Sequence, residues 1–186
     1  MVSDPTPLQF KRRVAALSAI FAVAAGLRLL QYAASNSLWL DELYVALNVT
    51  RSGWADLLFE PLAYNQVAPL GFLALEKLAT SLLGNGELVL RFFPTFFSLI
   101  SMILFWRVCT RFLEGGSLLV ALGLFAINPV FLWTARNTKQ YSGDIMVVLV
   151  LLLLALRFRE GKNDIRSTII AGVVGGLGIL LSQPAV

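Results

Sequence analysis

The sequence predicts an all-α protein, a polytopic bundle that crosses a membrane about five times. Hydrophobic residues make up 58% of its 186 residues and charged residues only 14%, whereas soluble domains carry roughly 25% charged residues. The apolar residues form runs long enough to span a bilayer as helices. Lys and Arg gather in short clusters between these runs, as residues that set membrane topology do. The net charge of +4 therefore does not indicate nucleic-acid binding, and we expect no nucleic-acid partner.

Residue counts restrict the chemistry that the chain can perform. Histidine is absent, which excludes histidine general bases and histidine metal ligands. Cys109 is the only cysteine, so no disulfide forms within the chain. Any acid–base catalysis must use Asp, Glu, Lys, Tyr or Arg.

The first apolar run covers residues 14–34 and follows the basic triplet Lys11-Arg12-Arg13. A secretory signal peptide with a cleavage site at Ala33-Ala34-Ser35 is an alternative. The length of the run, the presence of Arg28 within it and the further apolar runs favour a membrane helix. Its N-terminus is then expected in the cytoplasm.

Residues 35–88 are mixed in character. Trp39 and the acidic pair Asp41-Glu42 stand where the first span ends, at the expected boundary between water and lipid. Residues 41–51 predict a short amphipathic helix, with an apolar face of Leu43, Ala46, Leu47 and Thr50. The segment 70–83 is apolar except for Glu76-Lys77.

The distribution of basic residues decides whether 70–83 crosses the membrane. If it does not, spans fall near 14–34, 89–110, 117–135, 141–157 and 168–186, and the cytoplasmic side receives the clusters at 11–13, 107–111 and 157–166. If it does, the last two clusters fall outside, against the positive-inside rule. We therefore expect 35–88 to be one outer loop, in which 70–83 rests on the membrane and lets Glu76 and Lys77 reach water.

Two features mark the later spans. Asn128-Pro129 predicts a kink in the third span, because proline interrupts the helical hydrogen bonds. The fifth is rich in glycine, which permits close helix contact. The sequence stops at Pro184-Ala185-Val186 without a polar tail, and we expect the natural chain to continue, so that this is an N-terminal part.

The predicted topology gathers polar residues on the outer face. A carboxylate there can take a proton from an attacking hydroxyl, and Arg or Lys can hold a phosphate. Structural roles are the alternatives: helix capping for Asp41-Glu42 and Asp144, snorkelling for Arg28, an ion pair with Glu87 for Arg91 and interfacial anchoring for Arg136 and Lys139.

Three stretches in order, SLWLDELYVALNV, QVAPLGFLALEKLATSLLGNGELVLRFFP and ARNTKQYSGD, resemble the membrane glycosyltransferases of family 39. These include protein O-mannosyltransferases and the aminoarabinose transferases of lipid A, and they share the GT-C fold. The resemblance implies catalysis by Asp41, in the position of the base, and its neighbour Glu42. It also implies that Arg28, Arg91 and Lys139 hold the phosphate of a lipid-linked donor.

The remaining residues would support the acceptor; they are Asp144, Tyr141, Gln66 and Arg136. The family's His-Pro-Pro-Leu type motif is replaced here by Gln66-Val67-Ala68-Pro69-Leu70, which leaves the acceptor open among lipid, glycan and protein. No cofactor is assigned, and a divalent metal at Asp144 is left open.

The resemblance thus predicts inverting transfer of a sugar from a polyprenyl-phosphate donor at the outer (periplasmic or luminal) face, in a bacterial inner membrane. Two alternatives are a non-enzymatic membrane protein, such as a lipid-linked sugar flippase or an assembly subunit, and an inactive fragment of the transferase.

Overall fold

The computed structural model describes residues 7–34, 37–161 and 164–183, and within these ranges every regular element is helical. The predicted all-α class is confirmed. Ser35 of the alternative cleavage site and the terminal Pro184–Val186 lie outside the described residues. The helices are α1 (Pro7–Ala33), α2 (Leu40–Arg51), α3 (Trp54–Phe59), α4 (Leu70–Leu83), α5 (Glu87–Leu90), α6 (Phe92–Cys109), α7 (Gly115–Ile127), α8 (Pro129–Arg136), α9 (Tyr141–Arg159) and α10 (Ile165–Leu181), with a 3₁₀ turn, η1, at Ala63–Asn65.

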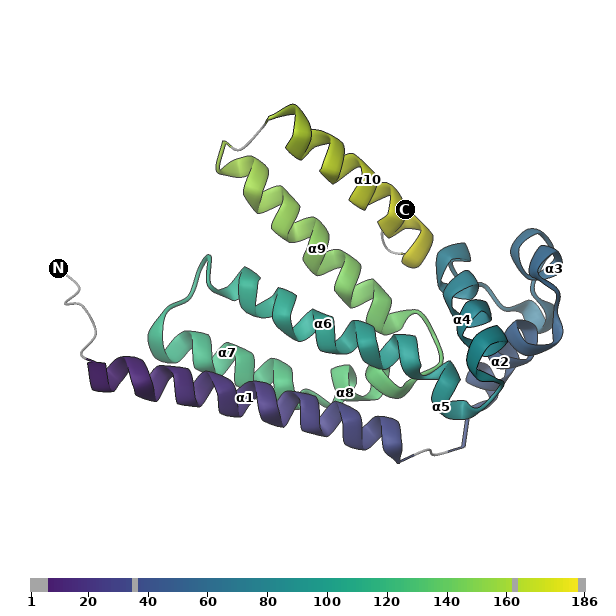
Figure 1. The fold of residues 1–186 in the computed structure, drawn as a ribbon, viewed down its shortest axis with the longest axis horizontal. Helices are drawn as coiled ribbons and strands as arrows, with labels where there is room; N and C mark the ends of the chain where they lie inside the picture. Colours follow the sequence, from purple (N-terminus) through teal and green to yellow (C-terminus); the bar gives the residue numbers. More distant parts are fainter. Residues whose placement is uncertain (1–6, 35–36, 162–163, 184–186) are drawn as a thin grey trace.

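The long helices form a bundle, and the short helices gather at one of its ends. Figure 1 shows α1, α6 and α7 side by side, with α9 and α10 continuing the layer. Helices α2 to α5 lie where α1 ends, where α6 and α9 begin and where α10 ends. One end of the bundle therefore carries the whole segment predicted as the outer loop.

Most of the long helices have the length and composition of membrane spans. Three stretches are long and apolar enough to cross a membrane: α1, the continuous stretch Glu87–Cys109, and α9. The bent pair α7–α8 would make a fourth span. Helix α10 is apolar but has only 17 residues, about 26 Å at 1.5 Å per residue, which is at the short limit for a span. The described residues thus hold three helices that can cross a membrane, or four if the bent pair is one span, and a shorter apolar helix where a fifth span was predicted, as in an integral membrane protein.

The predicted kink at Asn128-Pro129 is a break between α7 and α8, which meet at 46°. Pro129 has no N–H, so it opens α8 at the position where none is needed. The Asn128 side-chain oxygen accepts hydrogen bonds from the backbone N–H groups of Val130 at 2.9 Å and Phe131 at 3.3 Å. Asn128 therefore caps the second half of a broken span.

Helix α1 packs against the bundle core through Ala24 and Arg28. It packs along α6, α7 and α8, and Ala24 is buried in the same apolar cluster as Met102, Leu122 and Phe125. These contacts make α1 part of the helix bundle, which favours the membrane-helix interpretation of residues 14–34.

The outer segment has a small core of its own. Val45 and Val49 of α2 pack with Leu57, Phe72 and Leu73. The predicted apolar face of α2 is wrong in part, because Leu43 remains 39% exposed while Val45 and Val49 are fully buried. Side-chain hydrogen bonds explain why α2 is rotated about its axis from the predicted orientation.

Asn48 sets the orientation of α2. Its side-chain oxygen accepts from Ala63 N–H at 2.8 Å, and its side-chain nitrogen donates to the carbonyls of Ala63 at 3.2 Å and Tyr44 at 2.7 Å. These hydrogen bonds turn the polar side chain of Asn48 inward and hold α2 against η1.

Helix α4 has the predicted bounds, and its two charged residues differ. Lys77 donates from Nζ to the carbonyls of Val49 at 2.9 Å and Ser52 at 2.7 Å, which is favourable at the C-terminus of α2. The expectation that Glu76 reaches water is wrong: it is fully buried, because it shares the inward face with Phe72, Leu73 and Thr80. Burial raises the pKa of Glu76 well above the usual carboxyl range, which favours the neutral form of this side chain.

Candidate functional site

The site is built on the turn from Asn137 to Gln140, which joins α8 to α9. All four side chains of this turn are buried, and its backbone meets the first turn of α2. Helix α8 ends and α9 begins at the same end of the bundle as α2 (Figure 1). The turn is therefore the place where the predicted outer loop contacts the predicted third and fourth spans.

Asp41 forms an ion pair with Lys139 of this turn. The Lys139 ammonium also donates to the Gln66 side-chain oxygen at 3.1 Å. The Lys139 side chain is 10% exposed, whereas that of Asp41 remains 60% exposed. The hydrogen bond from Lys139 lowers the pKa of Asp41 below its ordinary value. Asp41 is thus an ionised carboxylate that is exposed to water and paired with the largely buried ammonium group of Lys139.

Glu42 has the opposite surroundings. It is 4% exposed, and each of its oxygens accepts a backbone N–H, that of Trp39 at 2.9 Å and that of Thr138 at 2.8 Å. The first bond caps α2, and the second joins α2 to the turn. The capping alternative is thus confirmed for Glu42.

Arg91 and Arg136 come together beside Glu42. They line a narrow pocket of about 10 Å³ with Trp39, Trp133, Ser37 and Asn137, room for about one water molecule. Arg91 lies at the junction of α5 and α6, where its side chain is 2% exposed, and its guanidinium is 3.8 Å from the Glu87 carboxylate. The structure therefore brings two predicted site residues together with Glu42.

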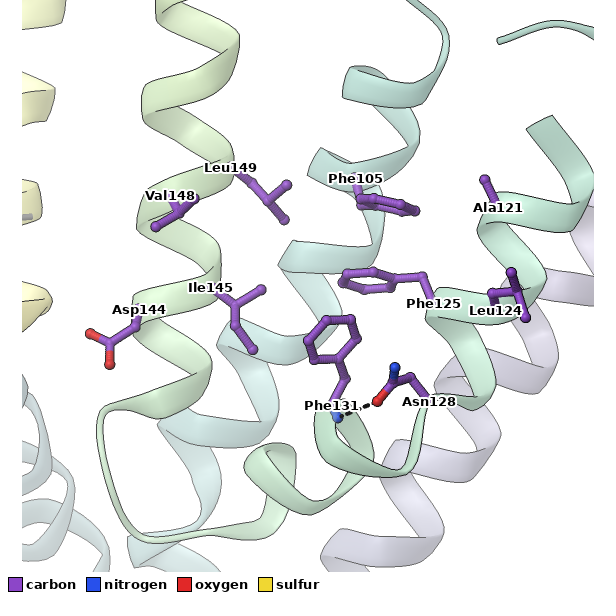
Figure 2. A pocket seen from close by; sticks show the side chains of 10 residues that line it. All are labelled: Phe105, Ala121, Leu124, Phe125, Asn128, Phe131, Asp144, Ile145, Val148 and Leu149. Atoms are coloured by element: carbon purple, nitrogen blue, oxygen red, sulfur yellow. Dashed lines mark hydrogen bonds between the residues drawn. The ribbon is translucent and has the colours of Figure 1, made fainter. Parts of the chain in front are cut away.

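Tyr141 and Asp144 begin α9 and point in different directions. Tyr141 stacks on Trp133 with a centroid distance of 5.8 Å, beside the pocket of Arg91. Asp144 faces Ser182 and Gln183 at the end of α10, and Figure 2 shows its carboxylate pointing away from Phe105, Phe125 and Phe131. Asp144 therefore does not contact Asp41.

Arg28 lies inside the bundle, fully buried. Its Nε donates to Ser98 Oγ at 2.9 Å, and its Nη1 donates to the carbonyls of Ala24 at 3.0 Å and Ala126 at 3.2 Å. Nη2 has no hydrogen-bond partner within the ranges that the structure describes. The guanidinium thus binds to the broken α7 and keeps one N–H group unused; its binding to a donor phosphate stays a prediction.

Two cavities adjoin these residues. One of about 620 Å³ is lined by Phe105, Phe125, Phe131 and their apolar neighbours, with Asn128 at one end (Figure 2). The other, of about 500 Å³, lies in the outer segment between Leu57, Glu60, Asn65 and Gln66. Sequence patterns did not reveal either cavity: the first is formed by helices α6 to α9, and the second, whose lining lies within residues 57–73, depends on how the chain folds around η1.

The part of the chain that the structure describes holds no group of three or more Cys, Asp or Glu side chains arranged for a metal. A divalent metal at Asp144 is not tested by this observation.

Comparison with protein families finds a match. The family described as dolichyl-phosphate-mannose-protein mannosyltransferase matches residues 67–186, which are 120 of the 186 residues. The match covers Arg91, Arg136, Lys139, Tyr141 and Asp144.

The acidic pair, Arg28 and Gln66 lie before the matched residues, so their assignment rests on the geometry given above. Comparison with curated proteins and with solved structures finds no match. Because the family matches well over half of the chain, which is an all-helical membrane protein, the chain belongs to the dolichyl-phosphate-mannose-protein mannosyltransferase family, whose members are glycosyltransferases with lipid-linked donors.

Proposed function

We propose that this protein transfers a sugar from a polyprenyl-phosphate donor to an acceptor hydroxyl or amine, with inversion, at the outer face of a bacterial inner membrane. The observation that carries the proposal is the exposed Asp41 carboxylate, held by Lys139 and Gln66 at the end of the bundle where the spans meet. Sugar transfer needs a base in water beside a cation for the leaving phosphate, and this pair supplies both.

Asp41 is the general base. Its carboxylate is mostly exposed and ionised, so it can accept the proton of the attacking acceptor. Glu42 is unsuited to this role, because both of its oxygens already accept backbone N–H groups. Its contribution is to place Asp41 and the turn at 137–140 in contact.

Lys139 contacts the donor phosphate and stabilises the charge that develops as it leaves, while Arg91 and Arg136, which line a pocket with room for about one water molecule, add positive potential at the same end of the bundle. Lys139 is shared between Asp41 and the incoming phosphate. A phosphate that draws the ammonium away would raise the pKa of Asp41, and the carboxylate would become a stronger base only when the donor is bound. Arg28 is fully buried, so it would contribute through its charge and not by direct contact with the phosphate.

The acceptor enters through the 500 Å³ cavity of the outer segment. Gln66 lines this cavity and touches Lys139, so an acceptor held there lies next to Asp41. Tyr64 and Asn65 both have positive φ, 61° and 52°, a conformation that costs non-glycine residues energy and often marks binding segments. Tyr141, stacked on Trp133, and Asp144, which faces Ser182, would support the start of α9.

Paired substitutions in the purified full-length protein test the role of Asp41. Asp41→Asn should reduce the rate of sugar transfer by about 10²–10⁴, as expected for loss of a general base, with little change in thermal stability. Glu42→Gln should lower stability by about 1–3 kcal/mol, because an amide leaves one buried N–H without an acceptor, while the folded fraction stays active.

A stable Asp41→Asn protein with normal transfer would refute the assignment. It would leave the non-enzymatic alternative, a flippase or an assembly subunit, as the better interpretation of the outer face.

A further inference from the structure

A third cavity, of about 480 Å³, lies at the end of the bundle opposite α2–α5, and the proposed reaction does not use it. It is formed by the last turns of α6 and α9 and by one side of α10. Figure 1 shows that α6 and α9 begin close together and diverge toward this end. Three arginines and a larger number of apolar residues line the cavity.

The lining residues come from one face of each helix. On α9, Val150, Leu154 and Arg157 are separated by four and three residues and therefore share a face. Leu104 and Arg107 of α6 are three residues apart and do the same. On both helices the arginine stands nearer to the helix end, about 10 Å beyond Val150 in the case of Arg157. The cavity thus has apolar walls at bilayer depth and cations at its outer rim.

The arginines are only partly neutralised by the protein. Arg111 forms an ion pair with Glu160. The Arg107 guanidinium lies 5.3 Å from the centre of the Trp106 ring, and neither Arg107 nor Arg157 forms an ion pair with an acidic residue in the described ranges. No acidic side chain of those ranges lines the cavity.

One more acid is affected by these cations. The pKa of Asp164, at the start of α10, is lowered mainly by a hydrogen bond from Ser167 and in small part by the charge of Arg157. If Asp164 and Glu160 are both counted against the three arginines, one positive charge remains among these residues. A single phosphodiester group carries the charge that would balance it.

Positive residues at this end also agree with the positive-inside rule and with the charge at helix C-termini. Neither effect requires arginines of two helices to meet around an apolar cavity. A soluble anion would use the arginines but leave the apolar walls without a partner. An amphipathic anion uses both, and basic pockets between membrane helices on the cytoplasmic side bind anionic lipid headgroups.

We infer that this cavity binds an anionic phospholipid. Its phosphodiester lies between Arg107 and Arg157, and its acyl chain runs along Leu104, Val150 and Leu154. The lipid joins α6 to α9 where the two helices diverge, so its binding stabilises the bundle. This inference does not depend on the proposed sugar transfer.

Thermal unfolding of the purified full-length protein in detergent tests the site. Phosphatidylglycerol should raise Tm above the value in phosphatidylcholine with the same acyl chains, by roughly 3–6 °C at a concentration about ten times Kd. Arg107→Gln and Arg157→Gln together should abolish the difference. Arg159→Gln is the matched control and should keep it, because it removes the same charge from the last turn of α9 without changing the lining of the cavity.

Equal Tm values of the unsubstituted protein in the two lipids would overturn the inference, even if a variant failed to fold. A rise as large with inorganic phosphate at equal ionic strength would show that the cavity takes a free anion, and would overturn the assignment to a lipid. A difference that persists in the double variant, or that Arg159→Gln also abolishes, would overturn the assignment to this cavity.

Discussion

Adjacent residues of a helix point about 100° apart, and this explains why Asp41 and Glu42 differ so strongly. Glu42 faces the turn at 137–140, and each of its carboxylate oxygens accepts a hydrogen bond from a backbone N–H group. Asp41 faces water and Lys139. The sequence predicted both a catalytic and a capping role for the pair. It could not divide the roles, because the partner of Glu42 is 96 residues away.

The ion pair of Asp41 predicts a distinctive pH dependence. The rate at low substrate, kcat/KM, reports the free enzyme, and kcat reports the loaded one. Lys139 holds the pKa of Asp41 below its ordinary value in the free protein, so kcat/KM should decline only at strongly acidic pH. Donor phosphate competes for Lys139, and the acidic decline of kcat should therefore lie at higher pH.

Lys139→Gln tests this explanation. The acidic decline of kcat/KM should move to higher pH, toward the value of an ordinary Asp, and the separation between the two profiles should shrink. Stability follows the same sign: the ion pair stabilises the fold above the unfolded pKa of Asp41, and this contribution is lost as pH falls through the folded pKa. Unchanged profiles in the variant would contradict the shared role of Lys139.

Among the elements, α4 was predicted with its observed bounds and α2 with the wrong face. Pro69 precedes α4 and Gly84 ends it with a φ of 91°, so both limits are local signals that a sequence displays. The orientation of α2 depends on Asn48 and its bonds to η1. Such side-chain hydrogen bonds carry no periodic pattern. The burial of Glu76 was missed although it shares the inward face of α4 with Phe72 and Leu73, because a charged residue was expected to reach water.

The contact between α4 and α10 is close enough to exclude a side chain. A Cβ atom at Gly71 would be 2.6 Å from the Leu180 carbonyl oxygen, and backbone atoms cannot move aside cheaply. Gly71→Ala should therefore destabilise the protein by about 1–3 kcal/mol, measured by thermal or denaturant unfolding in detergent.

Gly26→Ala is the matched control. No atom lies within 4 Å of a Cβ atom built at this position in α1, and alanine in a helix interior is favoured over glycine by roughly 0.5–1 kcal/mol. This variant should be slightly more stable than the unsubstituted protein. If Gly71→Ala matched it, the packing of α4 against α10 would be looser than described.

For the whole molecule, successive spans were predicted to run in opposite directions, and the arrangement in Figure 1 agrees with this prediction. The turns after α6 and after α9 lie at the end of the bundle opposite α2–α5, and Arg111 and Glu160 of these two turns form an ion pair. The sequence predicted this alternation from basic clusters alone. The cavity of about 620 Å³ and the contacts of the turn at 137–140 needed the assembled structure, because they join helices that are distant in the chain.

Cysteine labelling tests which end faces outward. With Cys109 replaced by serine, Glu60→Cys should react with a membrane-impermeant maleimide on intact cells. Glu160→Cys should react only after permeabilisation, because the basic clusters keep its turn in the cytoplasm. The reverse pattern would contradict the proposed orientation of the site.

Arg28 has a consequence for the biosynthesis of the protein. Two of its hydrogen-bond partners, Ser98 and Ala126, follow it by 70 and 98 residues. A ribosome adds roughly 5–20 residues per second, so α1 waits about 5–20 s in the membrane before Ala126 has been made. During this interval the guanidinium must reach the headgroups or the insertion machinery for its hydrogen bonds. The first span can settle into its final position only when the third has entered the bilayer.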